Sequence, residues 1–169
     1  KGKLGEARTL HIVSTLHTEI VAEVFIECLS GSRLSMTRSL EMPSEFSHDI
    51  YLIIAPQMFD RMPPPERTII MQMEQINASN WATPEYLERI SKSLGILDYS
   101  CDNINALGDR GIPSRQMFYV PLIPYKKEGP QPQDRDIDVL FYGAISPSRR
   151  KRYIKARSEH MKMRVESDL

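Results

Sequence analysis

Polar side chains that could bind a ligand follow an apolar run near the middle of the sequence. Residues 68–71 read Thr-Ile-Ile-Met, as expected of a buried strand, and Gln72, Glu74 and Gln75 come after them. Amides and carboxylates suit the neighbouring hydroxyl groups of a sugar, because together they donate and accept hydrogen bonds. The alternative is that Glu74 and Gln75 hold the loop from Ile76 to Trp81 in place by bonding to its backbone.

Other apolar runs also end in polar side chains. These residues are His17 after residues 10–14, Gln57 after residues 49–55, and Asp98 and Tyr99 at the end of residues 96–99. The carboxyl ends of parallel strands share one edge of a sheet, and ligands bind there. We therefore expect these side chains to converge on one rim, with His17 available as a base. The plainer alternatives are a surface or capping role for His17, and a helix that starts after Tyr99 with Ser100 as its cap.

Gly143, Arg149 and Arg150 follow another apolar run, residues 137–142. A glycine at a strand end lets a backbone N–H approach a phosphate, and a guanidinium group binds a diphosphate through two hydrogen bonds. These three residues could therefore hold the phosphates of a nucleotide. The alternative is a basic helix exposed to solvent, which is the usual role of a run of charges. The lack of interleaved aromatic residues disfavours contact of this segment with a membrane or with nucleic acid.

Short apolar runs alternate with helix-forming segments along most of the chain. The runs predict strands at residues 10–14, 34–40, 49–55, 67–71, 96–99, 117–120, 137–142 and 162–165. Helical spacing and capping residues predict helices over residues 19–29, from a Thr83 cap to about Leu94, and over residues 102–109 and 149–161. Strands that are apolar throughout are covered on both faces. The predicted fold is therefore α/β, with a doubly wound, mostly parallel, Rossmann-like sheet and helices on both faces.

The composition excludes some classes of protein. The chain has 169 residues, with 22 Lys and Arg against 22 Asp and Glu, so no overall charge steers it to nucleic acid or to an anionic membrane. Cys28 and Cys101 have no metal-binding spacing, which favours reduced thiols. No apolar run approaches the ~20 residues of a transmembrane helix. Residues 1–8 lack the apolar centre of a signal peptide, so we expect a cytoplasmic protein.

Several of these motifs together resemble bacterial glycosyltransferases of the GT-B type. The stretches that carry the resemblance are Tyr51-Leu-Ile-Ile-Ala-Pro-Gln-Met-Phe59, Ile70-Met-Gln-Met-Glu-Gln75 with Trp81 and Tyr86-Leu87, Ile96-Leu-Asp-Tyr-Ser100 with Asn103, and Asp138-Val-Leu-Phe-Tyr-Gly-Ala144 with Arg149-Arg150. The resemblance implies two Rossmann-like lobes across a cleft, the first on the acceptor side and the second on the nucleotide-sugar side. Residues 1–121 would form the first lobe, residues 122–136 a proline-rich linker and residues 137–169 the start of an incomplete second lobe.

The activity implied by this resemblance is transfer of a sugar from a nucleotide-sugar donor to an acceptor hydroxyl. His17 is the candidate base, with Glu74 as the alternative. The substrate-binding residues would be Gln57, Gln72, Gln75, Asp98, Tyr99 and Asn103. Gly143, Arg149 and Arg150 would hold the donor diphosphate, so neither a metal nor a separate cofactor is required. The sequence departs from the pattern because it has no later acidic pair for the nucleotide ribose and no G-x-G-x-x-G or P-loop.

Two other functions fit the same residues. The first is a non-catalytic module that binds a sugar or nucleotide, or that docks onto a protein partner supplying a second lobe. The second is a structural interaction domain, in which Met58, Met62 and Met73 form an exposed contact surface.

Overall fold

The computed structural model describes residues 6–121, 139–142 and 163–166. The chain divides into two compact units, Lys1–Tyr125 and Lys126–Leu169, which we describe separately. The predicted linker at residues 122–136 lies outside the described residues, as does the basic helix predicted at residues 149–161.

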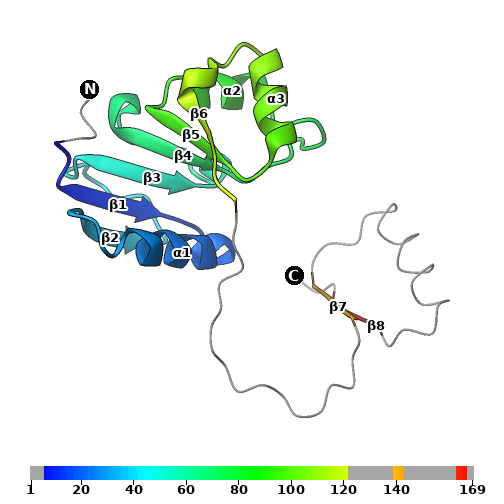
Figure 1. The fold of residues 1–169 in the computed structure, drawn as a ribbon, viewed down its shortest axis with the longest axis horizontal. Coiled ribbons are helices and arrows are strands. Elements are labelled where there is room, and N and C mark those ends of the chain that lie inside the picture. Colours follow the sequence, from blue (N-terminus) through cyan, green and yellow to red (C-terminus); the bar gives the residue numbers. More distant parts are fainter. Residues whose placement is uncertain (1–5, 122–138, 143–162, 167–169) are drawn as a thin grey trace. The chain divides into compact units, whose positions relative to one another are not determined.

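The first unit contains a six-stranded sheet in which every pair of neighbours is parallel (Figure 1). The strand order is β2-β1-β3-β4-β5-β6. The strands are β1 (Thr9–Val13), β2 (Ser35–Ser39), β3 (Ile50–Ile54), β4 (Thr68–Gln72), β5 (Gly95–Asp98) and β6 (Met117–Tyr119). The helices are α1 (Glu19–Leu29), α2 (Pro84–Ser91) and α3 (Cys101–Asp109), and four 3-10 turns are η2 (Leu16–Thr18), η3 (Pro56–Met58), η4 (Pro65–Arg67) and η5 (Ser114–Gln116). This confirms the α/β prediction.

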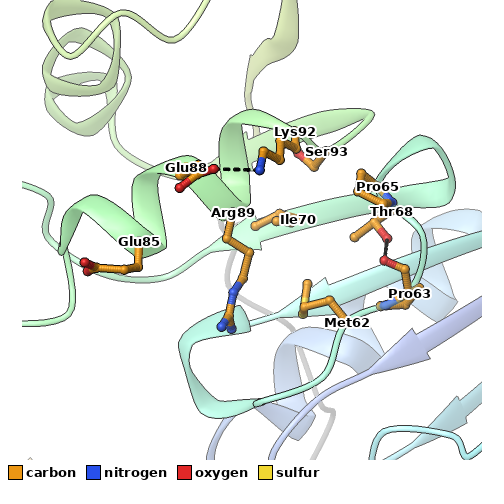
Figure 2. A pocket seen from close by; sticks show the side chains of 10 residues that line it. All are labelled: Met62, Pro63, Pro65, Thr68, Ile70, Glu85, Glu88, Arg89, Lys92 and Ser93. Carbon is orange, nitrogen blue, oxygen red and sulfur yellow. Dashed lines mark hydrogen bonds and ion pairs between the residues drawn. The ribbon is translucent and has the colours of Figure 1, made fainter.

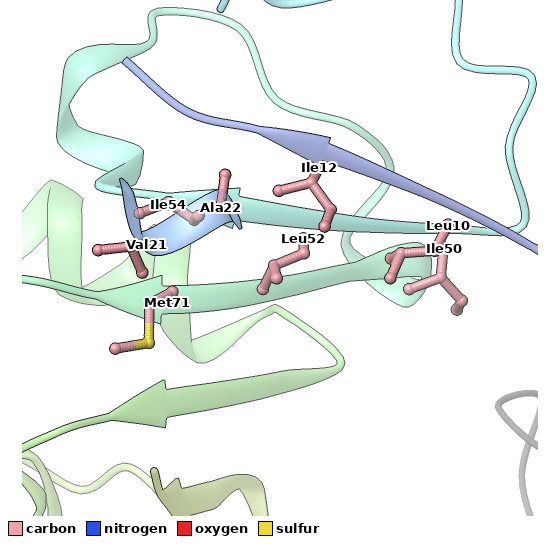
Figure 3. Packing of buried hydrophobic residues seen from close by; sticks show 8 residues of the cluster. All are labelled: Leu10, Ile12, Val21, Ala22, Ile50, Leu52, Ile54 and Met71. Atoms are coloured by element: carbon pink, nitrogen blue, oxygen red, sulfur yellow. The ribbon is translucent and has the colours of Figure 1, made fainter. Parts of the chain in front are cut away.

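Alternation of side chains along each strand produces two separate apolar layers. On one face, Leu10, Ile12, Leu52 and Met71 pack against α1 through Val21 and Ala22, as Figure 3 shows. On the opposite face, Ile70 and Ile96 pack against residues of α2 and α3. The sheet is therefore doubly wound, because the connection from β1 to β2 covers one face and those from β4 to β6 cover the other.

The helices on the second face begin at the caps that their sequences predict. The Thr83 hydroxyl accepts a hydrogen bond from Tyr86 N, and Pro84 occupies the first turn of α2. The Ser100 hydroxyl accepts one from Asn103 N at the start of α3. These caps satisfy backbone N–H groups that a helix cannot bond internally. Both helices therefore begin beside the carboxyl edge of the sheet.

The predicted end of α2 is wrong by three residues. The helix stops at Ser91 rather than near Leu94, and Gly95 opens β5 rather than closing the helix. The Ser93 hydroxyl donates to Ile90 O at 2.7 Å, and Leu94 N donates to Thr68 O at 2.8 Å. The chain leaves the helix early because Leu94 already bonds to the neighbouring strand.

The second unit contains two described strands, β7 (Val139–Tyr142) and β8 (Met163–Glu166), which pair in parallel. Both strands were predicted: β7 begins two residues after its predicted start and ends as predicted, and β8 lies one residue later than predicted. Gly143, Arg149 and Arg150, the predicted phosphate-binding residues, lie outside the described residues.

Candidate functional site

The predicted rim lies at the carboxyl edge of the sheet, where β3, β4 and β5 end side by side. Gln57 follows β3 in the turn η3, Glu74 follows β4, and Asp98 is the last residue of β5. The register pairs Gln72 with Asp98, which brings the ends of β4 and β5 to the same level. The fold therefore places these predicted residues at one edge of the sheet.

Glu74 connects the end of β3 with the loop that follows β4. Its Oε1 accepts a hydrogen bond of 2.7 Å from Gln57 Nε2, and its Oε2 accepts one of 2.6 Å from the Ser79 hydroxyl. Ser79 Oγ in turn accepts a hydrogen bond from Trp81 N at 3.1 Å. The carboxylate is half-buried. Glu74 thus does hold the loop, although it does so through the Ser79 side chain rather than by bonding to backbone N–H groups.

Gln72 is fully buried and bonds to the backbone two residues ahead of it. Its Nε2 donates to Glu74 O at 2.6 Å, and its Oε1 accepts from Glu74 N. Both ends of the amide are therefore used in turning the chain away from β4. Substrate binding by Gln72 stays a prediction, and the contacts present give this residue a role in shaping the loop.

Asn103 joins the same loop to α3. Its Nδ2 donates to Glu74 O at 2.7 Å and to Asp98 Oδ1 at 3.2 Å, and its Oδ1 accepts from Ile76 N at 3.1 Å. A buried amide with three such bonds fixes the relative positions of the residues that it contacts. Asn103 is thus the connection between Asp98 and the loop that carries Glu74.

Asp98 is completely buried, and only one of its oxygens has a partner. Oδ1 accepts from Ser100 N at 2.8 Å as well as from Asn103, whereas Oδ2 accepts no hydrogen bond from any described residue. Burial raises the pKa of Asp98 to about 6, against the lowering effect of these hydrogen bonds. Burial and the nearby Asp98 and Glu74 also raise the pKa of Tyr99, whose hydroxyl donates to Met73 O at 3.4 Å.

Tyr86 belongs to this site although the sequence analysis gave it no role in the chemistry. It is the third residue of α2 and is 5% exposed, and its hydroxyl has no partner among the described residues. Burial, and next the charges of Glu74 and Asp98, raise the pKa of this hydroxyl. A tyrosine one turn after the Thr83 cap was the available signal, since such a residue lies beside the strand ends. We call Gln57, Glu74, Tyr86, Asp98 and Asn103 the carboxyl cluster.

His17 and Gln75 differ from the carboxyl cluster in being exposed. His17 lies in η2 after β1, and no hydrogen bond joins its side chain to Glu74 or to another described residue. Its role as a base stays a prediction. The Gln75 carbonyl accepts from Ala78 N and Ser79 N, so its backbone closes the turn while its side chain faces solvent.

The proposed methionine surface is largely absent. Met58 is 53% exposed, but Met62 and Met73 are partly buried against the apolar layers. Met73 is partly buried because side chains alternate along β4, so that Met73 lies on the same face as the buried Met71. Cys28 and Cys101 are free and exposed, in agreement with their predicted reduced state.

A cavity of about 290 Å³ lies elsewhere, between α2 and the segment before β4, and contains none of the predicted site residues (Figure 2). Three of its four charged side chains, Glu88, Arg89 and Lys92, already have partners. Lys92 Nζ lies 2.6 Å from Glu88 Oε1, and Arg89 donates to Phe59 O at 2.7 Å. We therefore place the candidate site at the carboxyl cluster.

Among the described residues, no group of three or more His, Cys, Asp or Glu side chains is placed to hold a metal ion. In the same part of the chain, no helix is both long enough and apolar enough to cross a membrane. Comparison of the chain with models of known protein families and with curated proteins finds no match.

Proposed function

We propose that the first unit is the acceptor-binding lobe of a GT-B-like glycosyltransferase. The observation that supports this most is the Glu74 carboxylate, which is half-buried at the carboxyl edge of a parallel sheet and is oriented by Gln57 and Ser79. Each carboxylate oxygen can accept a further hydrogen bond. Glu74 is therefore suited to receive the hydroxyl proton of a sugar acceptor.

In the proposed reaction, a sugar passes from a nucleotide-sugar donor to the acceptor hydroxyl. Either Glu74 or His17 takes the acceptor proton, and Gln75 extends the binding surface along the rim. Gly143, Arg149 and Arg150 stabilise the charge that develops on the departing diphosphate. This division of roles rests on the resemblance described above.

The test uses the full chain with a panel of UDP- and GDP-sugars and simple methyl glycosides as acceptors, and follows release of the nucleoside diphosphate. Glu74→Gln should reduce transfer at least tenfold, with acceptor binding weakened. Glu85→Gln is the matched control, because Glu85 is an exposed acid at the start of α2. Equal activity of the wild type and Glu74→Gln would rule out the proposed role of Glu74.

A second function is favoured by one observation. A catalytic histidine is usually oriented by a hydrogen bond, and His17 has none within the described residues. A non-catalytic module that binds a sugar or nucleotide would fit this arrangement. Binding of a methyl glycoside that depends on Glu74, without release of nucleoside diphosphate from any donor, would identify the protein as such a module.

A further inference from the structure

Exposed apolar side chains of the first unit gather at the edge of the sheet that holds Glu74. They follow the carboxyl ends of four strands that are neighbours in the sheet. These residues are Leu16 and Ile20 after β1, Leu40 after β2, Met58 after β3 and Trp81 in the loop after β4. Two further exposed residues of this kind, Phe118 and Tyr119, lie in β6. A single exposed apolar residue is ordinary, whereas a group of them at one edge marks a binding surface.

Two of these residues are neighbours of the side chains that hold the Glu74 carboxylate. Gln57, which donates to Glu74 Oε1 at 2.7 Å, directly precedes Met58 in η3. Ser79, which donates to Glu74 Oε2 at 2.6 Å, accepts a hydrogen bond from Trp81 N at 3.1 Å. Met58 and Trp81 are each about half exposed. Each residue that orients the carboxylate therefore has an exposed apolar neighbour.

Leu16 and Ile20 extend this surface to the end of β1. Leu16 is 70% exposed in η2, and Ile20 lies four residues later in the first turn of α1. Residues four apart in a helical segment are neighbours on its surface. Because β1 pairs with β3, and β3 with β4, the apolar residues follow three adjacent strand ends. Three strands span on the order of 10 Å, which is more than one sugar ring covers.

The carboxyl groups at this edge do not suit an anionic membrane. Glu41 directly follows Leu40, and Glu74 lies at the end of β4. The guanidinium group of Arg38 lies 3.3 Å from Glu19 and 3.6 Å from Glu23, so its charge is already compensated. Anionic lipid surfaces are bound by clusters of Lys and Arg. A small ligand with both polar and apolar parts therefore fits this edge better than a lipid surface.

We propose that the acceptor is amphipathic, with an apolar group attached to the sugar that carries the reacting hydroxyl. The sugar hydroxyls bond to Glu74, and the apolar group lies against Met58, Trp81 and the turn that carries Leu16 and Ile20. Covering these side chains removes apolar surface from water, which supplies most of the affinity. The preference for an apolar group stands on the exposed residues alone, whereas the name acceptor rests on the proposed function.

The test compares methyl and n-octyl glycosides of the same sugars, with each octyl glycoside kept below its micelle-forming concentration. Binding to the full chain is followed by the fluorescence of Trp81, its single tryptophan, so no donor is needed. We expect the octyl glycosides to bind about tenfold more tightly, because several additional CH₂ groups leave water. Equal affinity for the two kinds of glycoside, or binding of neither, would overturn the proposal.

The variants locate the apolar part of the site. Leu16→Ser combined with Ile20→Ser should reduce the octyl preference to about twofold or less and leave the binding of methyl glycosides unchanged. Phe118→Ser is the matched control, because Phe118 is also about half exposed but lies within β6. Circular dichroism checks the fold of each variant. If the double variant does not fold, Leu16→Ser alone should reduce the preference about threefold. A preference that survives these changes, or that Phe118→Ser reduces equally, would overturn the proposal.

Other occupants of this edge have distinct outcomes. A wild type that is dimeric by light scattering, with a monomeric Leu16→Ser variant, would assign the edge to a second copy of the chain and overturn the proposal. Cosedimentation with phosphatidylglycerol vesicles that Leu16→Ser abolishes would assign it to a membrane, with the same consequence. The proposed function fails separately, if the octyl glycosides bind as expected but no donor releases its nucleoside diphosphate in their presence.

Discussion

Two polar clusters lie on the same face of the sheet, one partly open to water and the other largely buried. The histidine cluster, His11, Thr37, Ser39, His48 and Tyr51, spans β1, β2 and the segment before β3. The carboxyl cluster lies at the ends of β4 and β5. Among the described residues, the first cluster has one buried polar atom without a partner, His48 Nδ1, whereas the second has three, Gln57 Oε1, Tyr86 Oη and Asp98 Oδ2. The comparison shows that burial shifts the pKa values of a histidine and an aspartate on one face in opposite directions.

In the histidine cluster, the donor and acceptor of each hydrogen bond can be assigned from one end of the chain of bonds to the other. Ser39 donates its only proton to Glu41 O at 2.6 Å, so it must accept from His11 Nε2 at 2.9 Å. His11 Nδ1 then accepts from the Thr37 hydroxyl at 2.7 Å, and Thr37 accepts from His48 Nε2 at 3.0 Å. His11 is neutral in this arrangement, because its Nδ1 accepts a hydrogen bond. A proton on His11 Nδ1 would reverse its bond with Thr37, because the nitrogen would then donate and the hydroxyl would accept.

Lowering the pH should therefore change the stability contributions of His11 and Asp98 in opposite directions. Burial, and next the neighbouring His48, lower the pKa of His11, so its contribution to stability is present above its unfolded pKa of 6.5 and is lost as the pH falls through the folded value. The pKa of Asp98 is raised, so its contribution is present below its unfolded pKa of 3.8 and is lost as the pH rises through about 6. The same fold thus loses one contribution and gains the other as the solution becomes more acidic.

The largest expected effect comes from breaking the carboxyl cluster at its centre. Asn103→Leu removes three hydrogen bonds and leaves Ile76 N without an acceptor, so the free energy of unfolding should fall by about 3 kcal/mol. Urea denaturation followed by circular dichroism measures this change. Asn105→Leu is the control, because Asn105 is exposed on the same helix, and it should change stability by less than about 0.5 kcal/mol. Equal losses in the two variants would contradict the central role of Asn103.

The next effect isolates the pH response of the carboxyl cluster. Asp98→Asn should gain stability relative to the wild type as the pH rises, because the wild type loses its proton and the variant has none to lose. Between pH 4.5 and 7 the difference in unfolding free energy should grow by about 2 kcal/mol. Urea denaturation at a series of pH values measures it. A difference that is constant over this range would show that Asp98 has an ordinary pKa.

A smaller effect should follow from breaking the histidine cluster. Thr37→Val keeps the shape and strand preference of the side chain but removes the hydroxyl that joins His11 to His48. We expect a loss of about 1 kcal/mol at pH 7.5, because the edge strand is partly open to water. Ser35→Ala on the same strand is the control and should be near neutral. A stabilising effect of Thr37→Val would mean that the hydroxyl does not connect the two rings as described.

The smallest expected effect tests how Ser79 holds the loop beside Glu74. Ser79→Ala removes one hydrogen bond to the half-buried Glu74 carboxylate, and the stability should fall by only about 0.5 kcal/mol because water can replace the hydroxyl. The emission of Trp81 should change more clearly, since Ser79 also holds Trp81 N. Unchanged emission would show that Ser79 does not position Trp81.

Much of the fold was predictable because it depends on patterns within short segments. The apolar runs of β1, β3 and β4 are buried on both faces, which indicates a parallel sheet covered by helices. The start of α2 was predicted from Thr83 and Pro84, and the bounds of α1 from its helical spacing. The end of α2 was not predictable in this way, since it depends on a bond between Leu94 and β4.

The candidate site was predictable in position but not in its contacts. The order of strands and polar residues placed Gln57, Glu74 and Asp98 at one edge, because parallel strands end together. His11, His48 and Tyr86 were missed, since nothing in their local sequence distinguishes them from ordinary strand, loop and helix residues. Their importance arises from neighbours distant along the chain.

By itself, therefore, the sequence determined which segments become strands and helices and which residues meet the carboxyl edge. Only the tertiary structure decided the partner of each polar atom. Gln57 and Glu74 are 17 positions apart, and Glu74 and Asn103 are 29 apart, yet both pairs are hydrogen-bonded. Strand periodicity fixes the face on which a side chain lies, whereas a hydrogen bond also requires direction and an available proton. Those are properties of the assembled neighbourhood, which a pattern within one short segment does not contain.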